Sequence, residues 1–591
     1  MSPPAPGIDR SAIAAVLRET GDLLELQGEN PFRSRAYSNG ARAIEGLAED
    51  PQELLEQGRL GEVRGIGPGL VGAIAEIVQT GRLSLHDSLK SIYSKGVLDL
   101  LRVPGLGPKR LRQLIAAFGV DSPAALERAC RDGRVAALPG FGEKSAEKLL
   151  AGLARLEKFR ERHLYPEARA VALELAAYLS AHPAVARLEI AGSLRRSRET
   201  IGDIDLLAEI PEGDRAGLVA RFTTAPAVEE VIEQGATKAA VRLTDGYRAD
   251  LRMVEAQEFA AALLHFTGSK EHNVELRGRA KERGWTLNEY GLFAGERRLG
   301  KTDSEAAIYR RLGLSYIPPE AREGLGEIAL ADGAELPRLV EWRDVRGALH
   351  VHTDWSDGIA SLDAMAEAAA ALGWEYLGIA DHSRSAAYAG GLSVERVREQ
   401  WQAIDAWNAA GRSPRLFKGT EVDILSDGSL DFSDELLLEF DFVVASVHSR
   451  FGLTGEAMTA RLVRAVRHPC VTFLGHPTGR LLLMREPYAL DLDAVLDAAA
   501  DNQVVVELNS NPLRLDLDWR PLRGWLSRGC RTALNPDAHS PQGLADVGFG
   551  VGIARKALAT PGQVINCLPV EEVGDFFRQR RERAKASLRQ A

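Results

Sequence analysis

The stretch Gly192-Ser-Leu-Arg-Arg-Ser-Arg-Glu-Thr-Ile-Gly-Asp-Ile-Asp-Leu206 decides how the middle of the chain is interpreted. Asp203 and Asp205 stand two residues apart at the start of an apolar run, so in a strand both side chains point to one face. Carboxylates this close repel each other unless a cation lies between them. Asp250, in a second strand-like run, can complete a three-carboxylate cluster. Such oxygen clusters suit Mg²⁺ or Mn²⁺.

The residues before these carboxylates strengthen the signal. Gly192 and Ser193 can cradle a triphosphate through backbone N–H groups and a hydroxyl, and Arg196 can clamp its charge. An Asp-x-Asp pair alone is common and mostly structural. Gly-Ser-x-Arg-Arg followed closely by Gly-Asp-x-Asp is instead typical of nucleotidyl transfer. Two metal ions there activate an attacking hydroxyl and stabilise the leaving pyrophosphate.

A short glycine motif occurs three times in the first part of the chain, at Val63–Gly69, Val103–Lys109 and Leu138–Lys144. Each copy reads apolar-x-Gly-apolar-Gly and precedes a helical stretch. Two glycines permit a tight turn with positive φ, and the N-terminus of the next helix then faces outward as an anion site. This pattern is the helix-hairpin-helix signature, which grips a nucleic-acid backbone without reading bases. The alternative is three ordinary helical corners, which the repetition disfavours.

A third set of residues lies in residues 346–575, where short apolar strands alternate with Ala- and Leu-rich helices. That alternation predicts a parallel sheet or barrel. Six histidines end predicted strands, and parallel α/β folds place their active sites at those ends. Nitrogen and oxygen ligands suit Zn²⁺, Mn²⁺ or Fe, and nine ligands suffice for two or three ions. The predicted ligands are His350, His352, Asp357, His382, Glu421, His448, His476, Asp537 and His539.

Length and composition limit the possible classes of protein. The chain has 591 residues, 45% hydrophobic and 26% charged, with a formal net charge of −10, which excludes a mostly disordered chain. No run reaches the ~18 apolar residues of a membrane helix, and the Pro-rich polar start is not expected to be a signal peptide. Four scattered cysteines argue against a disulfide framework and a cysteine-based zinc finger. Only the first 160 residues carry a slight basic excess, so any nucleic-acid binding must come from local sites.

The sequence resembles a family X DNA polymerase of the bacterial and archaeal kind that carries an extra C-terminal domain. His265-Phe-Thr-Gly-Ser-Lys-Glu-His-Asn273 matches the fingers motif of that family, and Leu287-Asn-Glu-Tyr290 follows as expected. The resemblance implies that Asp203 and Asp205 bind both metal ions, and that Asp250 binds the catalytic one and helps to deprotonate the primer 3′-OH. It further implies that Phe266 and Gly268 pack the incoming sugar, that Asn273 contacts the nascent pair, and that Arg277 contacts the template side.

Residues 346–575 resemble the polymerase-and-histidinol-phosphatase (PHP) domain at all nine ligand positions, in order. That family is a distorted (βα)₇ barrel with a trinuclear site acting on phosphoesters. The resemblance implies two to three Zn²⁺ or Mn²⁺ ions and a Mn²⁺-dependent 3′→5′ exonuclease activity, or processing of 3′ ends. Arg450 and Arg480, close to His448 and His476, are predicted phosphate contacts.

Two positions depart from the family pattern. His265 stands where vertebrate repair members have Tyr, which puts the basis of sugar discrimination in doubt. Ala73 stands where those members have a Lys that forms a Schiff base with abasic sugar, and no lysine lies between Met1 and Leu89. We therefore expect no lyase activity, because an arginine cannot replace the amine nucleophile.

These features predict a multidomain chain. The predicted segments are a helical N-terminal domain (1–85), a helix-hairpin-helix subdomain (86–160), an α+β nucleotidyltransferase palm (161–256), fingers (257–335), a linker (336–345), the PHP barrel (346–575) and a basic tail (576–591). The predicted DNA-backbone contacts are Gly65, Gly67, Gly105, Gly107, Lys109, Gly140, Gly142, Lys144 and Arg277.

The preferred hypothesis is a two-site repair enzyme: the polymerase half fills short gaps, and the barrel cleans or proofreads 3′ ends. Its partners would be gapped or nicked DNA and dNTPs, with Mg²⁺ or Mn²⁺ at the polymerase site, in a monomer at the cytoplasmic nucleoid. A small-molecule phosphatase fused to another nucleotidyltransferase is a second hypothesis, but it predicts no backbone-gripping repeat. A scaffold that binds DNA ends with two weak sites is a third, and the complete ligand sets count against it.

Overall fold

The computed structural model describes residues 10–45, 47, 51–63, 65–103, 105–159, 161–300, 303–333 and 336–590. The chain divides into two compact units, Met1–Arg160 and Glu161–Ala591. The sequence predicted a boundary at the same place. The predicted boundary before residue 336 adjoins residues 334 and 335, which lie outside the described part, as do Met1–Asp9 and Ala591.

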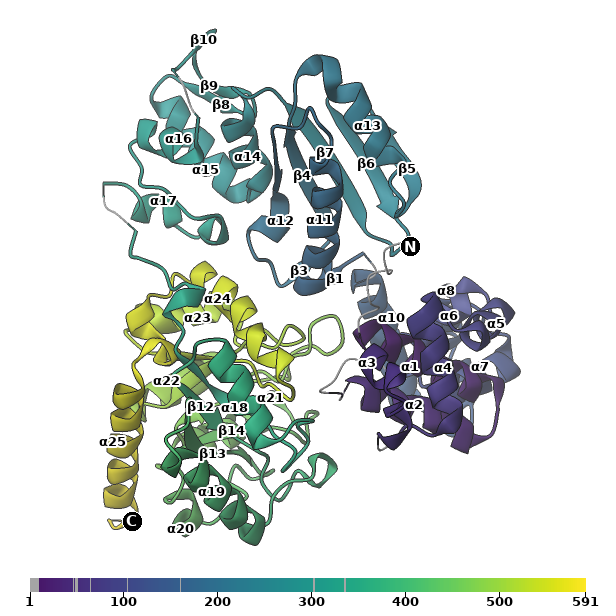
Figure 1. Ribbon diagram of the computed structural model, residues 1–591, viewed down its shortest axis with the longest axis vertical. Coiled ribbons are helices and arrows are strands. Elements are labelled where there is room, and N and C mark those ends of the chain that lie inside the picture. The colour runs from purple at the N-terminus through teal and green to yellow at the C-terminus, as the bar shows by residue number, and fades with distance from the viewer. Residues whose placement is uncertain are drawn as a thin grey trace. The chain divides into compact units, whose positions relative to one another are not determined.

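The first unit is helical throughout its described residues, as predicted (Figure 1). The predicted division between residues 85 and 86 falls inside α5, so a single helix joins the two predicted segments. The helices are α1 (Arg10–Gln27), α2 (Pro31–Glu45), α3 (Pro51–Glu56), α4 (Pro68–Thr80), α5 (Ser84–Ile92), α6 (Lys95–Leu101), α7 (Pro108–Phe118), α8 (Pro123–Arg131), α9 (Arg134–Ala137) and α10 (Glu143–Phe159).

The three glycine turns share one backbone geometry. In each turn the apolar residue between the glycines donates its N–H to the carbonyl three residues earlier, at 3.0, 3.0 and 2.9 Å. The first glycine is left-handed each time, with φ of 97°, 83° and 87° at Gly65, Gly105 and Gly140. The following helices α4, α7 and α10 begin directly after the second glycine. The predicted helix-hairpin-helix units are confirmed.

The second unit begins with a five-stranded sheet in the order β2-β4-β7-β6-β5. Only β4 and β7 are parallel neighbours; the other pairs are antiparallel. A separate two-stranded pair, β1 (His163–Leu164) with β3 (Thr200–Ile201), precedes β4. The sheet elements are β2 (Arg187–Ile190), α12 (Gly192–Arg195), β4 (Asp203–Glu209), β5 (Val228–Gln234), β6 (Lys238–Leu243) and β7 (Arg248–Val254), with helices α11 (Tyr165–Ser180) and α13 (Arg215–Thr223).

The two faces of this sheet pack against different elements. Ile204, Leu206 and Ala208 of β4 belong to the core that the sheet forms with α11 and α13. The alternating residues lie on the opposite face, where Leu207 packs in a small cluster with Phe259 of the next helix. Because side chains alternate along a strand, Asp203 and Asp205 share this second face.

A smaller helical subdomain follows. Its core contains Leu264, Leu276, Ile308 and the fully buried Tyr309. The predicted division between residues 256 and 257 falls between β7 and α14. The elements are α14 (Phe259–Thr267), α15 (Lys270–Glu282), β8 (Thr286–Asn288), β9 (Gly291–Ala294), β10 (Arg297–Arg298), α16 (Glu305–Arg311) and α17 (Glu327–Leu330).

Seven parallel strands in sequential order form the third part, as the βα alternation predicted. They are β11 (Gly347–Val351), β12 (Tyr376–Ile379), β13 (Arg415–Asp423), β14 (Phe442–Ser446), β15 (Phe473–Leu474), β16 (Val505–Asn509) and β17 (Thr532–Asn535). The helices are α18 (Leu362–Ala371), α19 (Val394–Ala409), α20 (Asp434–Leu437), α21 (Gly455–Val466), α22 (Leu492–Asp501), α23 (Trp519–Ser527), α24 (Val547–Lys556) and α25 (Val570–Leu588). The predicted (βα)₇ fold class is confirmed.

Aromatic side chains fill one end of the barrel. Phe417, Phe442 and Phe473 from three strands pack with Phe577 in one buried cluster. Gly419 makes room for them, since a Cβ there would lie 2.1 Å from the Phe442 ring. The aromatic cluster leaves the other end of the strands for polar side chains.

The prediction of a separate basic tail at residues 576–591 is wrong for its described part. Helix α25 begins at Val570 and runs to Leu588 without a break. Phe577 on this helix is 2% exposed, and Arg580 donates to the backbone carbonyls of Val471 and Asn502. The helix therefore belongs to the barrel, because its apolar face covers the aromatic end while Arg580 donates to carbonyls of the loops next to the strands.

The seam between the first and last strands is held largely by asparagine side chains. Asn566 accepts from the N–H of Leu534 at 2.7 Å and donates to the carbonyls of Gly347 and Leu534 at 3.0 and 2.9 Å. Asn535 accepts from the N–H of Leu349 at 3.0 Å. A single parallel bridge, Val351 to Ala538, continues the contact past the strand ends. The seam brings β11 beside β17 without a regular ladder.

Within the described ranges, no helix combines the length and apolar composition needed to cross a membrane.

We expect Asn566→Ala to destabilise the barrel by about 3 kcal/mol or more, because it leaves buried backbone groups of Gly347 and Leu534 without partners. Calorimetric unfolding would measure this loss. Asn502→Ala is the matched control: among the described residues its side chain bonds only the carbonyl of Ala498 in α22, and the loss of that bond should cost less than about 1 kcal/mol. Equal losses in the two variants would contradict the proposed role of the seam.

Candidate active sites

The first site is the carboxylate cluster of the sheet. In the parallel pair β4–β7, Asp205 stands directly opposite Asp250. Asp203, Asp205 and Asp250 each offer an oxygen atom, and these atoms lie within 4.8 Å of one another. Three carboxylate oxygens at this separation are suited to a divalent cation with oxygen ligands. The structure thus brings together the three aspartates that the sequence singled out.

The local backbone explains the glycine of the Gly-Ser motif. Gly192 has φ 62°, and a Cβ at this position would lie 1.9 Å from Oδ2 of Asp205. The carboxylate therefore packs directly against the glycine at the start of α12. Burial, together with the charges of Asp203 and Asp250, raises the pKa of Asp205 to about 7. A bound cation would remove this electrostatic cost.

Arg248 is a member of this site that the sequence analysis missed. Its guanidinium pairs with both oxygens of Asp250 at 3.0 and 3.1 Å. The signal in the sequence is the i, i+2 spacing, which places Arg248 and Asp250 on the same face of β7.

Arg196, the predicted triphosphate clamp, lies in an ion network that extends to the barrel part of the same unit. It contacts Glu323 at 3.1 Å and donates to the carbonyl of Thr267. Arg198 also contacts Glu323, at 3.1 Å. Lys556 of α24 is buried against the same carboxylate, and burial lowers its pKa to about 8. A polar network of this kind holds the Arg196 side chain in a defined position.

The predicted fingers residues lie on α14 and α15 and, for Gly268, in the turn between them. Asn273 donates to the carbonyl of His265 at 2.7 Å, and both residues line one pocket with Arg277. A Cβ on Gly268 would lie 2.9 Å from the Arg196 guanidinium, so the glycine gives this arginine its space. The Phe266 ring lies edge-on to the His265 ring, and its centroid is 5.0 Å from Cζ of Arg252. Burial lowers the pKa of His265.

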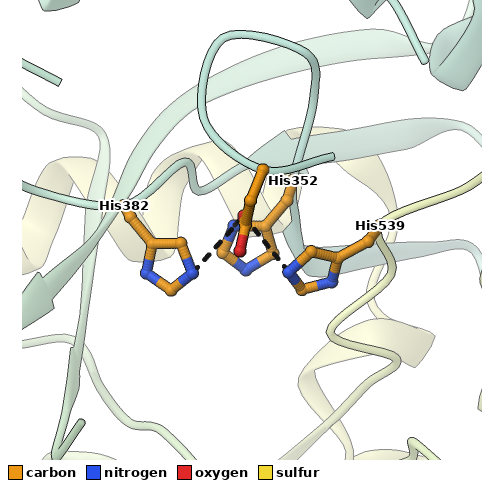
Figure 2. Close-up of side chains that lie close together, drawn as sticks. His352, His382 and His539 are labelled. Atoms are coloured by element: carbon orange, nitrogen blue, oxygen red, sulfur yellow. Dashed lines mark ion pairs between the residues drawn. The ribbon is translucent and has the colours of Figure 1, made fainter. Parts of the chain in front are cut away.

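The second site lies at the ends of the barrel strands. Figure 2 shows the rings of His352, His382 and His539 turned toward a common point. An oxygen of Asp357 lies 3.5 Å from His382 and 3.3 Å from His539. Three overlapping ligand groups occur: His352, Asp357, His382 and His539; His350, His352 and Asp537; and His382, Glu421 and His448. The first group shares His352 with the second and His382 with the third. The ninth predicted ligand, His476, joins through Glu421 at 2.9 Å.

These residues fit metal ions. Nε2 of His350, both ring nitrogens of His352 and Oε2 of Glu421 are buried and make no hydrogen bond to any described residue. Buried polar atoms without partners are costly, and metal ligation would satisfy them. Against the effect of burial, the carboxylates raise the pKa of His382 to about 11 and of His448 to about 9. The field that stabilises imidazolium here equally attracts a metal cation.

Two further carboxylates hold ligand histidines from behind. Glu507 of β16 contacts Nδ1 of His350 at 2.8 Å and accepts from the backbone N–H of His476 at 3.1 Å. Asp423 contacts Nδ1 of His448. Such contacts fix the ring orientation and the tautomer of a ligating histidine. The sequence analysis missed both residues: Asp423 is the last residue of β13, and Glu507 lies in the middle of β16.

The two predicted phosphate contacts differ. Arg450 is exposed on the loop after β14. Arg480 is 9% exposed, and its guanidinium donates to the carbonyls of Arg514 and Leu515 and to Asp518. Three of the five guanidinium N–H groups of Arg480 thus hold the loop after β16. Proximity to His476 in the sequence did not reveal these acceptors.

Four family models match the chain. They are a helix-hairpin-helix domain (residues 8–83), a SAM-like helix-hairpin-helix tandem (97–155), the DNA polymerase beta thumb (262–323) and the PHP domain (348–511). Over 571 residues the chain is 37% identical to the DNA polymerase/3'-5' exonuclease PolX of Bacillus subtilis (strain 168), covering 96% of this chain and 99% of that protein. The chain belongs to the family X DNA polymerases that carry a PHP domain.

Other relatives match parts of this family X polymerase. DNA polymerase lambda of Rattus norvegicus is 27% identical over 329 residues, which cover 50% of this chain and 53% of lambda. A probable phosphatase of Syntrophotalea carbinolica is 27% identical over 167 residues, which cover 26% of this chain and 65% of the phosphatase.

The helix-hairpin-helix region of this family X polymerase has two notable features. Ala73 is 7% exposed and packs in the core of the first unit, so the position of the expected lysine is an apolar one here. A Cβ on Gly67, Gly105, Gly107, Gly140 or Gly142 would meet no atom within 4 Å. Packing within the protein therefore does not explain the second glycines, whereas close approach of a ligand backbone would. Lys109 and Lys144 are exposed beside them.

We expect metal binding at the aspartate cluster to strengthen with pH. With a pKa of about 7, Asp205 is mostly protonated at pH 6, and a cation must displace that proton. The Mn²⁺ affinity should therefore rise about fivefold between pH 6 and 7, reach about tenfold near pH 8 and level off above that pH. Calorimetric titration of the His350→Ala/His352→Ala variant would isolate this site. An affinity that does not change between pH 6 and 8 would contradict the shifted pKa.

We expect Glu507→Gln to weaken metal binding in the barrel by about 10- to 100-fold, because the carboxylate behind His350 is lost. Metal content per chain after dialysis against a weak chelator would measure the effect. Glu571→Gln, at the exposed start of α25, is the control. Equal metal retention by both variants would show that Glu507 does not support the ligands.

Proposed function

We propose that this family X polymerase fills short gaps in DNA by template-directed nucleotidyl transfer and removes or trims nucleotides at 3′ ends in its PHP barrel. One observation carries the proposal: a complete aspartate triad and a complete set of nine barrel ligands occur in one folded unit. The name of the Bacillus subtilis relative, a DNA polymerase and 3'-5' exonuclease, agrees with both halves.

In this proposal the polymerase site uses Mg²⁺ or Mn²⁺, and the barrel holds two to three Zn²⁺ or Mn²⁺ ions. When bound, the ions supply Lewis-acid activation of the attacking oxygen and neutralise phosphate charge. Asp203, Asp205 and Asp250 would hold the ions of the palm, and Asp250 would help to take the proton of the primer 3′-OH. Gly192, Ser193 and Arg196 hold the triphosphate of the dNTP.

The remaining residues orient the substrates. Phe266 and Gly268 contact the incoming sugar, Asn273 the nascent pair and Arg277 the template side. The glycine turns and Lys109 and Lys144 bind the DNA backbone through outward N–H groups and charge. The substrate is gapped or nicked DNA, the working form is a monomer, and the place of action is the cytoplasmic nucleoid, where this substrate is found.

A gapped-DNA assay tests the proposal, first with Mg²⁺ and then with Mn²⁺. We expect Asp203→Ala/Asp205→Ala to lose extension by at least a thousandfold while it still degrades the primer 3′ end. We expect His350→Ala/His352→Ala to lose degradation and to keep extension. Both losses follow from removal of the metal ligands of one site. If the wild-type protein bound the gap and did neither, the catalytic hypothesis would fail in favour of a DNA-end scaffold.

A further inference from the structure

The loop between β16 and α23 lies beside the metal-ligand cluster of the barrel and is firmly held. Arg480 donates to the carbonyls of Arg514 and Leu515. The Arg514 N–H donates to the carbonyl of Asn511 at 2.8 Å, and the Leu482 N–H donates to the carbonyl of Leu513 at 2.6 Å. The backbone of residues 511–515 is therefore held by internal hydrogen bonding and by the neighbouring segment that contains Arg480 and Leu482.

Arg514 extends from this loop to the metal-ligand cluster. Its Nε lies 3.4 Å from Oδ2 of Asp537. Asn509 donates to the same oxygen at 3.1 Å. The other oxygen, Oδ1, lies 3.1 Å from Nε2 of His352 and 3.6 Å from Nε2 of His350, with which Asp537 forms one ligand group. The two oxygens of Asp537 thus face different partners: Oδ1 faces the histidines, and Oδ2 faces Arg514 and Asn509.

The guanidinium of Arg514 retains unused hydrogen-bonding capacity. Its Nη1 is buried and donates to no acceptor among the residues that the structure describes. A buried donor without an acceptor is costly, and the cost is greater for a charged group. The cluster around it contains the carboxylates of Asp357, Glu421 and Asp537, yet only Asp537 pairs with this arginine. An anionic ligand at the metal site would supply the missing acceptor.

We propose that Arg514 is the phosphate-binding arginine of the barrel: it holds a non-bridging oxygen of the scissile phosphate while Asp537 ligates metal. The assignment rests on the proposed 3′-end activity and deepens it. A guanidinium suits this task because its donors lie in a planar fork that matches phosphate oxygens. Arg480, which donates to the carbonyls of Arg514 and Leu515, then acts by positioning Arg514.

The experiment compares Arg514→Gln and Arg514→Lys with Arg528→Gln, which alters a surface pair with Asp497 on the same part of the chain. Three quantities are measured on the Mn²⁺-loaded full-length protein: metal content per chain, the dissociation constant of inorganic phosphate, and kcat and KM for the p-nitrophenyl ester of thymidine 5′-monophosphate. Gapped-DNA extension at the palm serves as the folding control.

We expect Arg514→Gln to weaken phosphate binding at least tenfold and to raise KM by a similar factor, with wild-type metal content and extension. Arg514→Lys should recover part of the phosphate affinity, because a point charge remains but the fork is lost. An unchanged phosphate dissociation constant would overturn the proposal. Loss of metal together with activity would also overturn it, since Arg514 would then serve only to orient Asp537.

These outcomes are separable from a failure of the proposed function. If the wild-type barrel bound phosphate in an Arg514-dependent way and cleaved the ester, but left the 3′ ends of gapped DNA intact, the exonuclease proposal would fail while the role of Arg514 stood. If the wild-type protein degraded 3′ ends and Arg514→Gln did so with unchanged KM and phosphate affinity, the exonuclease proposal would stand. The role proposed for Arg514 would fail.

Discussion

The barrel metal site depends on the seam between its first and last strands. His350 and His352 belong to or directly follow β11, whereas Asp537 and His539 follow β17, nearly 190 residues later in the chain. Regular strand pairing does not join these ends; Asn535 and Asn566 do so through side-chain hydrogen bonds to backbone groups. Asn535 also donates to Glu507, which supports His350. Buried polar networks are stable only when every member has its partner. The hydrogen bonds that close the barrel therefore also orient a ligand.

In the palm, strand register brings together ligands that are distant in the sequence. A parallel pair, β4 and β7, sets Asp205 opposite Asp250, and Gly192 lets the Asp205 carboxylate approach the start of α12. In both sites, carboxylates gather where burial opposes their charge, and a cation relieves the repulsion. The sites differ in their ligands. The palm offers only oxygen, which suits Mg²⁺, while the barrel offers nitrogen and oxygen, which suit Zn²⁺ or Mn²⁺.

Glu323 connects the two halves of the second unit. Its carboxylate contacts Arg196 and Arg198 from the palm and Lys556 from α24. Arg555 of the same helix pairs with Glu320 at 2.8 Å, and Arg480 lies 3.8 Å from Glu199. The side chain proposed to hold the triphosphate is thus positioned partly by residues of the barrel part. Because removal of one partner from a buried ion network leaves the others uncompensated, the two halves are coupled energetically.

The sequence by itself determined what local spacing can determine. The glycine turns, the Asp-x-Asp pair, the βα alternation and the histidines at strand ends all follow from periodicities of two or from tight-turn requirements, which act within a few residues. The tertiary structure decided the rest. Strand β5, Val-Glu-Glu-Val-Ile-Glu-Gln, escaped prediction because it lies at the sheet edge and is largely exposed. The arginine-rich sequence of helix α25 suggests a separate tail, and only the packing of Phe577 at the aromatic end of the barrel shows that the helix belongs to the barrel. Arg480 and Arg514 are both arginines near metal ligands, and only their acceptors distinguish them. Such roles depend on partners distant in sequence, which chain folding alone brings within hydrogen-bond distance.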